Sequence, residues 1–232
     1  APAVTASAPT LNVTNVPVDY NTKTLTVTYS KNMDPAFVPS FSFLSGGAPA
    51  GGTPSWQTTK IAQYSFTGVL APETDYQIRV SGAKDTNGNA AAAYDLVFTT
   101  EARPQVSSTD PYDGKANVFV TPAAVSATFT KSMAPGSFTT STFTLYDVTL
   151  GSLVTSDPSD LSYVDGTKTA TLAVPGGLAA DTTYRATLTT GVTDLRGNAL
   201  ALAYEWEFQT AVEPDENIAS PAAGLGNALV TT

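Results

Sequence analysis

The sequence predicts an all-β protein made of two tandem β-sandwiches of about seven strands each, joined by a short proline-containing linker. Three observations carry this prediction. Only 13% of the residues are charged, and Thr, Ala, Ser and Val dominate, which suits strands and turns better than exposed helices. Short segments alternate apolar and polar residues between turn signals. One long pattern, Leu70 to Ala91, returns as Leu178 to Leu200.

The repeat extends over most of the chain. Residues 24–35, TLTVTYSKNMDP, correspond to residues 124–135, AVSATFTKSMAP. This alignment places the chain's two methionines, Met33 and Met133, at equivalent positions. The extra residues of the second copy fall between Phe143 and Leu172, where we expect loops to absorb them.

The expected strands follow the same order in both copies. An opening strand precedes a short element and an alternating strand, whose inward residues are Leu25, Val27 and Tyr29 in the first copy. Two alternating strands close each copy. The strands expected by these criteria include residues 1–9, 15–18, 24–29, 75–81 and 94–100, and then 103–111, 117–120, 124–129, 183–189 and 204–210.

The correspondences also set the expected domain boundaries. Domain 1 covers residues 1–101 and domain 2 covers residues 102–212, with the segment Glu101-Ala102-Arg103-Pro104 between the sandwiches. Such a short joint should limit swinging. Residues 213–232 repeat the proline spacing that begins both earlier copies, so they are expected to be a linker or the start of a third repeat.

Two tyrosines indicate the type of sandwich. Tyr76 and Tyr184 each follow an acidic residue by three positions and begin an alternating strand. In immunoglobulin-like sandwiches, a tyrosine at this place turns its hydroxyl back to the upstream backbone, forming a tyrosine corner. We therefore predict two immunoglobulin-like sandwiches with both tyrosine rings buried.

These motifs resemble those of the bacterial immunoglobulin-like domains found in S-layer proteins and adhesins. The resemblance rests on residues 15–35, NVPVDYNTKTLTVTYSKNMDP, on the two corners and on the Asp-x-x-Gly-Asn loops. One departure is Ala180, which stands where the first corner has Pro72. The resemblance implies a spacer, stalk or surface-lattice role in an extracellular or cell-surface location.

The composition excludes several kinds of chemistry. The chain has no cysteine and no histidine, which removes thiol chemistry, the Ser-His triad and the commonest zinc ligand. We therefore assign no catalytic, cofactor-binding or metal-binding residue and expect no enzyme activity. A net charge of -9 argues against nucleic acid, and no apolar run is long enough for membrane insertion.

Calcium is the one cofactor that the sequence leaves open. The loops at residues 85–89 and 194–198 offer oxygen ligands of the kind that Ca²⁺ takes. Each loop has a single carboxylate, however, and Arg196 adds a positive charge to the second. Asp and Asn before Gly are also typical of tight turns. We expect turns here and no bound cofactor.

Three further features have a structural and a functional interpretation. Trp56 lies beside a predicted hairpin and could contact a ligand or belong to the core. The equivalent lysines Lys31 and Lys131 could form an amide crosslink with an asparagine, but their place at a strand end favours solvated side chains.

The carboxylates Asp157, Asp160 and Asp165 could in principle act as a pair in glycoside hydrolysis. Asp-Pro and Asp-Gly are also turn formers, which favours a solvated hairpin.

The sequence thus predicts a non-enzymatic extracellular structural protein, a stalk, spacer or building block of a surface layer, adhesin or filament. The expected partners are other surface or extracellular protein domains, including copies of itself. Two alternatives remain. The chain could be a carbohydrate-binding or accessory module of a secreted polysaccharide-active enzyme, or a subunit whose C-terminal segment adds a strand to a neighbour.

Overall fold

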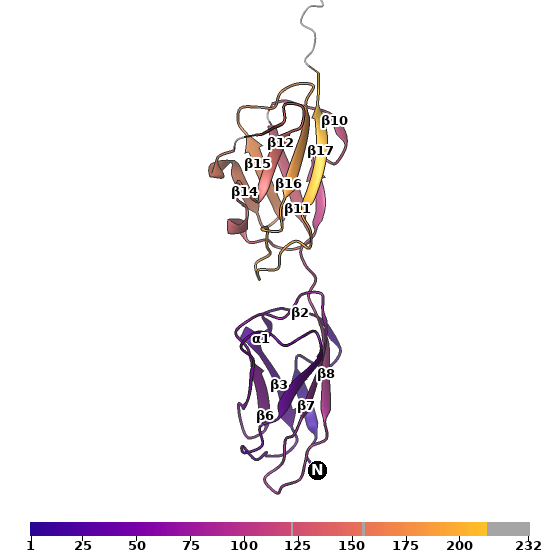
Figure 1. Ribbon diagram of the computed structural model, residues 1–232, viewed down its shortest axis with the longest axis vertical. Coiled ribbons are helices and arrows are strands. Elements are labelled where there is room, and N and C mark those ends of the chain that lie inside the picture. Colours follow the sequence, from indigo (N-terminus) through magenta and orange to yellow (C-terminus); the bar gives the residue numbers. More distant parts are fainter. Residues whose placement is uncertain (122, 155, 213–232) are drawn as a thin grey trace, which may run out of the picture. The chain divides into compact units, whose positions relative to one another are not determined.

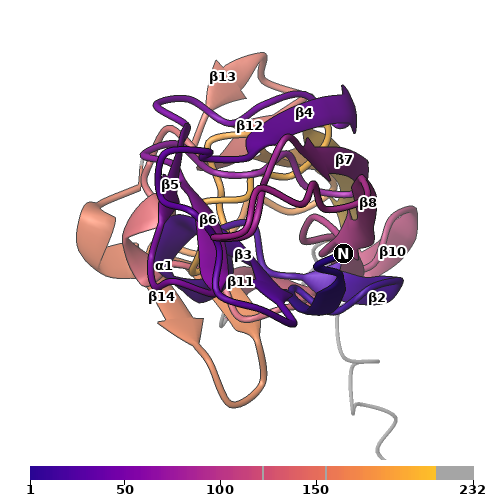
Figure 2. The same cartoon turned by 90° about the horizontal axis from the view of Figure 1, so that it is seen from below.

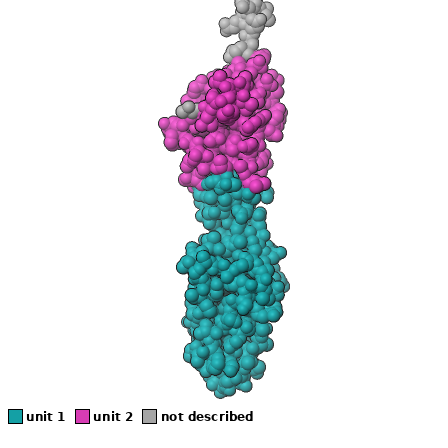
Figure 3. All heavy atoms as spheres, in the orientation of Figure 1, with its two compact units in different colours: residues 1–105, 130–134, 190–201 teal, residues 106–129, 135–189, 202–232 magenta. Residues whose placement is uncertain are grey.

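The computed structural model describes residues 1–121, 123–154 and 156–212, which form two β-sandwiches (Figure 1). Contacts divide the chain into two compact units, coloured in Figure 3. Unit 1 contains residues 1–105, 130–134 and 190–201, so it combines the first sequence copy with two loops of the second. Unit 2 contains the described parts of residues 106–129, 135–189 and 202–232. The predicted linker or third repeat, residues 213–232, lies outside the described residues.

Two four-stranded sheets build the first sandwich. The order β1-β3-β6-β5 in one sheet and β2-β8-β7-β4 in the other is the arrangement of an immunoglobulin-like domain. All neighbours are antiparallel except β2 and β8, which are parallel. The strands are β1 (Val4–Ala8), β2 (Val13–Val16), β3 (Thr24–Tyr29), β4 (Ser40–Ser45), β5 (Thr53–Trp56), β6 (Ile61–Ser65), β7 (Asp75–Ser81) and β8 (Tyr94–Thr100).

The second sandwich repeats this topology with one addition. Its sheets have the orders β14-β15-β11-β9 and β10-β17-β16-β12-β13. The extra strand β13 and the 3-10 turn η2 (Pro158–Asp160) lie between β12 and β15, where the sequence predicts the additional residues. The strands are β9 (Val106–Asp110), β10 (Lys115–Val118), β11 (Ala123–Phe129), β12 (Phe143–Asp147), β13 (Ser152–Leu153), β14 (Leu161–Val164), β15 (Thr169–Val174), β16 (Thr183–Leu188) and β17 (Tyr204–Thr210).

The core of the first sandwich lies between its sheets. In the end-on view of Figure 2, β3, β5 and β6 lie on one side of this sandwich and β4, β7 and β8 on the other. Strand β3 alternates strictly, and its three predicted inward residues, Leu25, Val27 and Tyr29, are all buried. The opposite sheet contributes Tyr76, Ile78, Val80, Leu96 and Phe98. Burying these side chains supplies the main driving force for folding.

The second core is built by the same alternation. Strand β11 buries Val125, Ala127 and Phe129 at the positions that the repeat predicts. Trp206 of β17 is 1% exposed and occupies the place of Leu96 in the first copy. Further buried apolar residues of the second copy include Phe138, Phe143, Leu145, Ala170, Leu172, Val174, Leu178, Tyr184, Ala186, Leu188 and Phe208.

Among the residues that the structure describes, helical structure is confined to single turns. The α-helical turn α1 (Tyr20–Lys23) precedes β3, and the 3-10 turns η1 (Pro135–Ser137) and η2 belong to the second copy. In the described part of the chain, no helix is long and apolar enough to cross a membrane. The all-β prediction is therefore confirmed.

Candidate functional site

Both predicted tyrosine corners are present. The backbone N–H of Ala71 donates a hydrogen bond to the hydroxyl of Tyr76 at 2.8 Å, and that of Ala179 donates to Tyr184 at 2.9 Å. The rings are buried, 1% and 3% exposed. Burial raises the pKa of the Tyr76 hydroxyl, although the Ala71 hydrogen bond opposes this. The two tyrosines therefore hold the fold together and present no aromatic platform to a ligand.

The Asp-x-x-Gly-Asn loops form tight turns around their aspartates. Asp85 Oδ1 accepts hydrogen bonds from the backbone N–H groups of Asn87 and Asn89, at 3.0 and 2.8 Å, and the Asn89 amide donates to the same carboxylate. In the second loop, Asp194 accepts in the same way from the backbone and side chain of Asn198. The sequence-predicted turns are confirmed.

Metal ligands are sparse around these loops. Within residues 1–121, 123–154 and 156–212, no three His, Cys, Asp or Glu side chains are grouped so that they could hold a metal ion. Each loop could offer Ca²⁺ one carboxylate, whose oxygens already accept hydrogen bonds from the loop itself. The expectation that no calcium is bound stays a prediction, which calorimetric titration with Ca²⁺ tests.

Four polar residues meet in the most buried ionic cluster that the structure describes, which we call the Glu101 cluster: Glu101, Lys131, Asp194 and Asn198. Lys131 Nζ lies 2.9 Å from Glu101 Oε2 and 2.9 Å from Asp194 Oδ2. The Asn198 amide donates to both carboxylates, at 3.3 and 3.0 Å. The side chains of Glu101 and Asp194 are only 8% and 3% exposed. All four residues belong to unit 1.

Backbone groups of the first copy also hold Glu101 in place. This residue follows β8, and its N–H donates to Val16 O at 2.8 Å. Its Oε1 accepts from the N–H of Val18 at 3.3 Å, and Arg196 Nη1 lies 3.7 Å from the same oxygen. The residues around a small cavity of about 210 Å³ at this place are Glu101, Lys131, Ser132, Asp194, Leu195 and Arg196.

The cluster keeps its acid and base charged. Burial alone would lower the pKa of Lys131, but hydrogen bonds to Asp194 and Glu101 outweigh it and raise that pKa. Burial would likewise raise the pKa of Asp194, yet hydrogen bonds from Asn198, Lys131 and the loop backbone leave it below its usual value. Amide formation needs a neutral amine, so this geometry favours a stable ion pair over a crosslink.

The expectation of solvated lysines is therefore wrong for Lys131, whose side chain is 26% exposed. Strand alternation could not reveal this contact, because Glu101 lies outside the strands. The available signal was the acidic residue in the short joint. Lys31 differs from its equivalent: its Nζ lies 3.9 Å from Asp85 Oδ2 and its side chain is 50% exposed.

Trp56 belongs to the edge of the first core. Its ring centroid lies 5.7 Å from that of Tyr29, and the residue packs against the buried cluster. Its indole N–H is buried and makes no hydrogen bond to any described residue. The orientation is that of a core residue.

The three carboxylates considered for glycoside hydrolysis serve local structure. Asp157 caps η2 by accepting from the backbone N–H of Ser159, and Asp160 completes the capping box. This backbone hydrogen bond also lowers the pKa of Asp157. Asp165 accepts from the Tyr163 hydroxyl at 3.2 Å. The turn interpretation is confirmed.

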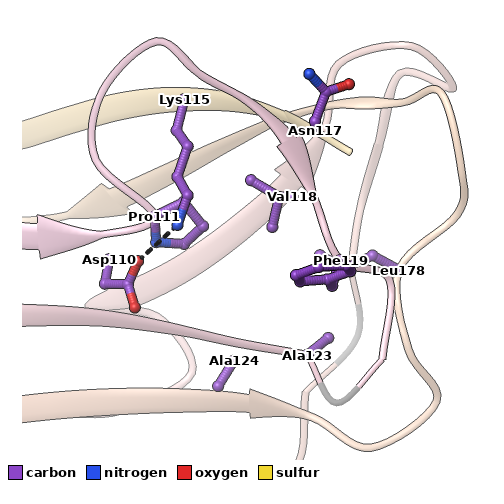
Figure 4. A pocket seen from close by; sticks show the side chains of 9 residues that line it. All are labelled: Asp110, Pro111, Lys115, Asn117, Val118, Phe119, Ala123, Ala124 and Leu178. Atoms are coloured by element: carbon purple, nitrogen blue, oxygen red, sulfur yellow. Dashed lines mark hydrogen bonds and ion pairs between the residues drawn. The ribbon is translucent and has the colours of Figure 1, made fainter. Parts of the chain in front are cut away.

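A shallow groove in unit 2 was not found by sequence reasoning (Figure 4). Phe119, which stands where the first copy has Pro17, is 80% exposed beside it. Lys115 Nζ pairs with Asp110 Oδ1 at 3.2 Å on the same groove. The cavity measures about 190 Å³ and its lining residues are Asp110, Pro111, Lys115, Asn117, Val118, Phe119, Ala123, Ala124 and Leu178.

Comparisons with solved structures find matches of low sequence identity. The N-terminal part of the bacterial S-layer protein SbsC is 16% identical, with 90% of this chain and 44% of that chain covered and a TM-score of 0.32. The I-band fragment I67-I69 from titin is 9% identical, with 91% and 65% covered and a TM-score of 0.33. The chain thus spans less than two thirds of either.

A search of curated proteins returns no match. A model of the bacterial Ig-like domain matches residues 1–100 and again residues 101–210. These two matches account for nearly all of the described chain and coincide with the two sequence copies. The chain belongs to the family of bacterial Ig-like domains.

Proposed function

We propose that this chain is a non-enzymatic structural protein of the cell surface, a stalk, spacer or building block of a surface layer, adhesin or filament. Family membership supports an architectural role. The observation that carries the proposal is the Glu101 cluster. Glu101 ends the first copy, whereas its partners Lys131, Asp194 and Asn198 come from loops of the second. Consecutive copies therefore share this ionic cluster inside unit 1.

Burial makes this contact suitable for a structural role. An exposed ion pair contributes little to stability because water and salt screen it. In a buried pair, removal of one partner leaves an uncompensated charge, which is strongly unfavourable. The Glu101 carboxylate is 8% exposed and accepts hydrogen bonds from the backbone as well as from Lys131. Separation of the two copies would have to rehydrate these groups.

The same arrangement is poorly suited to catalysis. A general acid or base needs a pKa near the working pH and access to a substrate. Here the lysine is held protonated and Asp194 is held ionised. Each is fully engaged with the other members of the cluster, which supports a structural assignment.

Immunolabelling of intact source cells tests the location. Antibody against the chain should bind without permeabilisation. Signal that needs permeabilised cells would contradict a surface role.

The substitution Glu101→Gln tests the contact between copies. It keeps the shape of the side chain and removes its charge. We expect Lys131 to react faster with an amine-acylating reagent, measured by peptide mass spectrometry, and the free energy of unfolding to fall by about 1 to 2 kcal/mol. The matched control is Glu207→Gln, which breaks the exposed pair with Arg185 and should cost about 0.5 kcal/mol or less. Unchanged Lys131 reactivity would contradict the proposal.

Polysaccharide binding is a second candidate, favoured by the exposed Phe119 ring at the groove in unit 2. Pull-down on insoluble glycans separates the two functions. A spacer stays in the supernatant. Retention that Phe119→Ala abolishes would favour the second candidate.

A further inference from the structure

The first copy contains a lysine site equivalent to that of the Glu101 cluster. We call it the first-copy lysine site: Lys31, Asp85 and Asn89. A β-bridge joins Met33 to Asp85, as another joins the equivalent Met133 to Asp194. Asp85 Oδ1 accepts from the Asn89 backbone at 2.8 Å, and the equivalent bond in the second copy is 2.9 Å. Both copies therefore build the same aspartate turn beside the same lysine.

The two sites differ in what the lysine contacts. Lys131 lies 2.9 Å from each of two carboxylates. Among the described residues, Lys31 makes one ion pair, with Asp85 at 3.9 Å. The Lys31 side chain is 50% exposed and that of Lys131 is 26% exposed. The first-copy lysine site therefore presents an accessible ammonium group next to amide donors, which suits a carboxylate.

The first residues of each copy indicate where a second carboxylate would lie beside Lys31. Gln105 N–H donates to Thr130 Oγ1 at 3.1 Å, and Ala3 N–H donates to Ser30 Oγ at 3.1 Å. The backbone therefore enters both opening strands in the same way, directly beside the lysine that follows Ser30 or Thr130. By this equivalence, a residue joined two positions ahead of Ala1 would lie where Glu101 lies in the second copy.

We propose that the first-copy lysine site binds the carboxylate of a glutamate that ends the last strand of another Ig-like module. The inference rests on the proposed structural function and names its partner. The described end of the second copy does not supply that carboxylate. Ala211 N–H donates to Val118 O as Glu101 N–H donates to Val16 O, so alanine stands at the equivalent place after β17. The partner is a module that ends as the first copy does.

A fusion tests this site. Residues 1–102 are added directly ahead of Ala1 of the full chain, which reproduces the spacing from Glu101 to Arg103. The added copy carries Lys31→Arg so that its own lysine is not counted. We expect acylation of the original Lys31 to slow about tenfold relative to the unfused chain, because an ion pair with the added carboxylate favours the protonated, unreactive amine.

The control fusion carries Glu101→Gln in the added copy alone. Its Lys31 should react about tenfold faster than in the first fusion, for the same reason. Equal Lys31 rates in the two fusions would overturn the inference. A second measurement uses melting temperature: Lys31→Gln should lower it more in the glutamate fusion than in the unfused chain, and equal shifts would also overturn the inference.

Lys131 in the unfused chain distinguishes this failure from failure of the proposed function. If Glu101→Gln leaves Lys131 reactivity unchanged, the contact between copies is wrong. If Lys131 is shielded by Glu101 but Lys31 is not shielded in the fusion, only the assignment of the first-copy lysine site is wrong.

Discussion

Tyr184 illustrates how one side chain determines a corner of the fold. Its ring stacks on Phe208 at 5.7 Å, and its hydroxyl accepts the backbone N–H of Ala179. Another apolar ring could fill the same space, but the hydroxyl is the hydrogen-bond partner that this N–H has among the described residues. A buried backbone N–H without a partner is costly.

The substitution Tyr184→Phe should therefore lower the free energy of unfolding by about 1 to 2 kcal/mol. Urea denaturation measures the change. Tyr112→Phe is the control, because Tyr112 is 60% exposed, and it should shift stability by less than about 0.5 kcal/mol. An unchanged midpoint for Tyr184→Phe would mean that the corner hydrogen bond contributes nothing.

Residue-scale predictions succeed where the interaction is local in sequence. The corner joins residues five apart, and Asp194 bonds to backbone groups two and four residues away. Motifs of this kind carry their own geometry. Lys131 bonds to Glu101, thirty residues away. The acidic type of Glu101 is a signal for an ion pair, but alternation does not indicate which lysine it contacts. Phe119 was missed because an exposed aromatic residue in a strand region is indistinguishable by pattern from a buried one.

At the scale of elements, the connection between β4 and β5 shows the limit of composition. Its glycines suggest a flexible loop, yet the loop is anchored: Ala50 O accepts the N–H groups of Thr67 and Gly68, both at 3.0 Å. Gly46 has a φ of +84°, and a Cβ there would lie 2.5 Å from the Tyr76 ring. Glycine is needed at this position for close approach as well as for backbone freedom.

Two alanine substitutions separate these roles. Gly46 and Gly47 both have positive φ, but a Cβ on Gly47 meets nothing within 4 Å. Each change should cost about 1 kcal/mol for the left-handed backbone, and Gly46→Ala should cost about 1 to 3 kcal/mol more through overpacking against Tyr76. Thermal or urea unfolding compares the two. Equal losses of unfolding free energy for the two substitutions would show that the Tyr76 ring can move aside without cost.

The strands themselves were predictable because each copy repeats one alternating pattern. Leu25, Val27 and Tyr29 are buried as the pattern requires, and so are Val125, Ala127 and Phe129. Strand β13 has only two residues, both exposed, and η2 is a single capped turn. Such short elements depend on neighbouring strands and local hydrogen bonds. The alignment of the two copies therefore predicts where the extra residues lie but not which secondary structure they form.

At the scale of the whole molecule, stability should depend on pH at the extremes alone. The folded pKa values of Asp85, Asp157 and Asp194 are lowered, Asp85 chiefly by the Asn89 side chain. Each contributes stability above the unfolded value, about 3.9, and loses it as pH falls through the folded pKa. Lys131 has a raised pKa, so its contribution is present below about 10.4 and is lost as pH rises through the folded pKa.

We therefore expect a plateau between about pH 5 and 9, since no histidine titrates there, with losses below about pH 4 and above about pH 10.5. Urea unfolding across this range measures it. Lys131→Met should lower the plateau by about 2 kcal/mol and weaken the alkaline loss. Constant stability down to pH 2 would contradict the assignment of ionised, hydrogen-bonded aspartates.

The first copy ends in Glu101, whereas the second has Ala211 at the equivalent position. This difference makes the order of the two copies matter. If the two copies exchanged places, composition, net charge and both cores would be preserved. Ala211 would then precede the copy that carries Lys31, so Lys31 would gain no carboxylate. Glu101 would end the chain and would contact neither Lys31 nor Lys131. Modules that look interchangeable by fold are thus made unequal by one side chain, and that inequality specifies which neighbour may follow which.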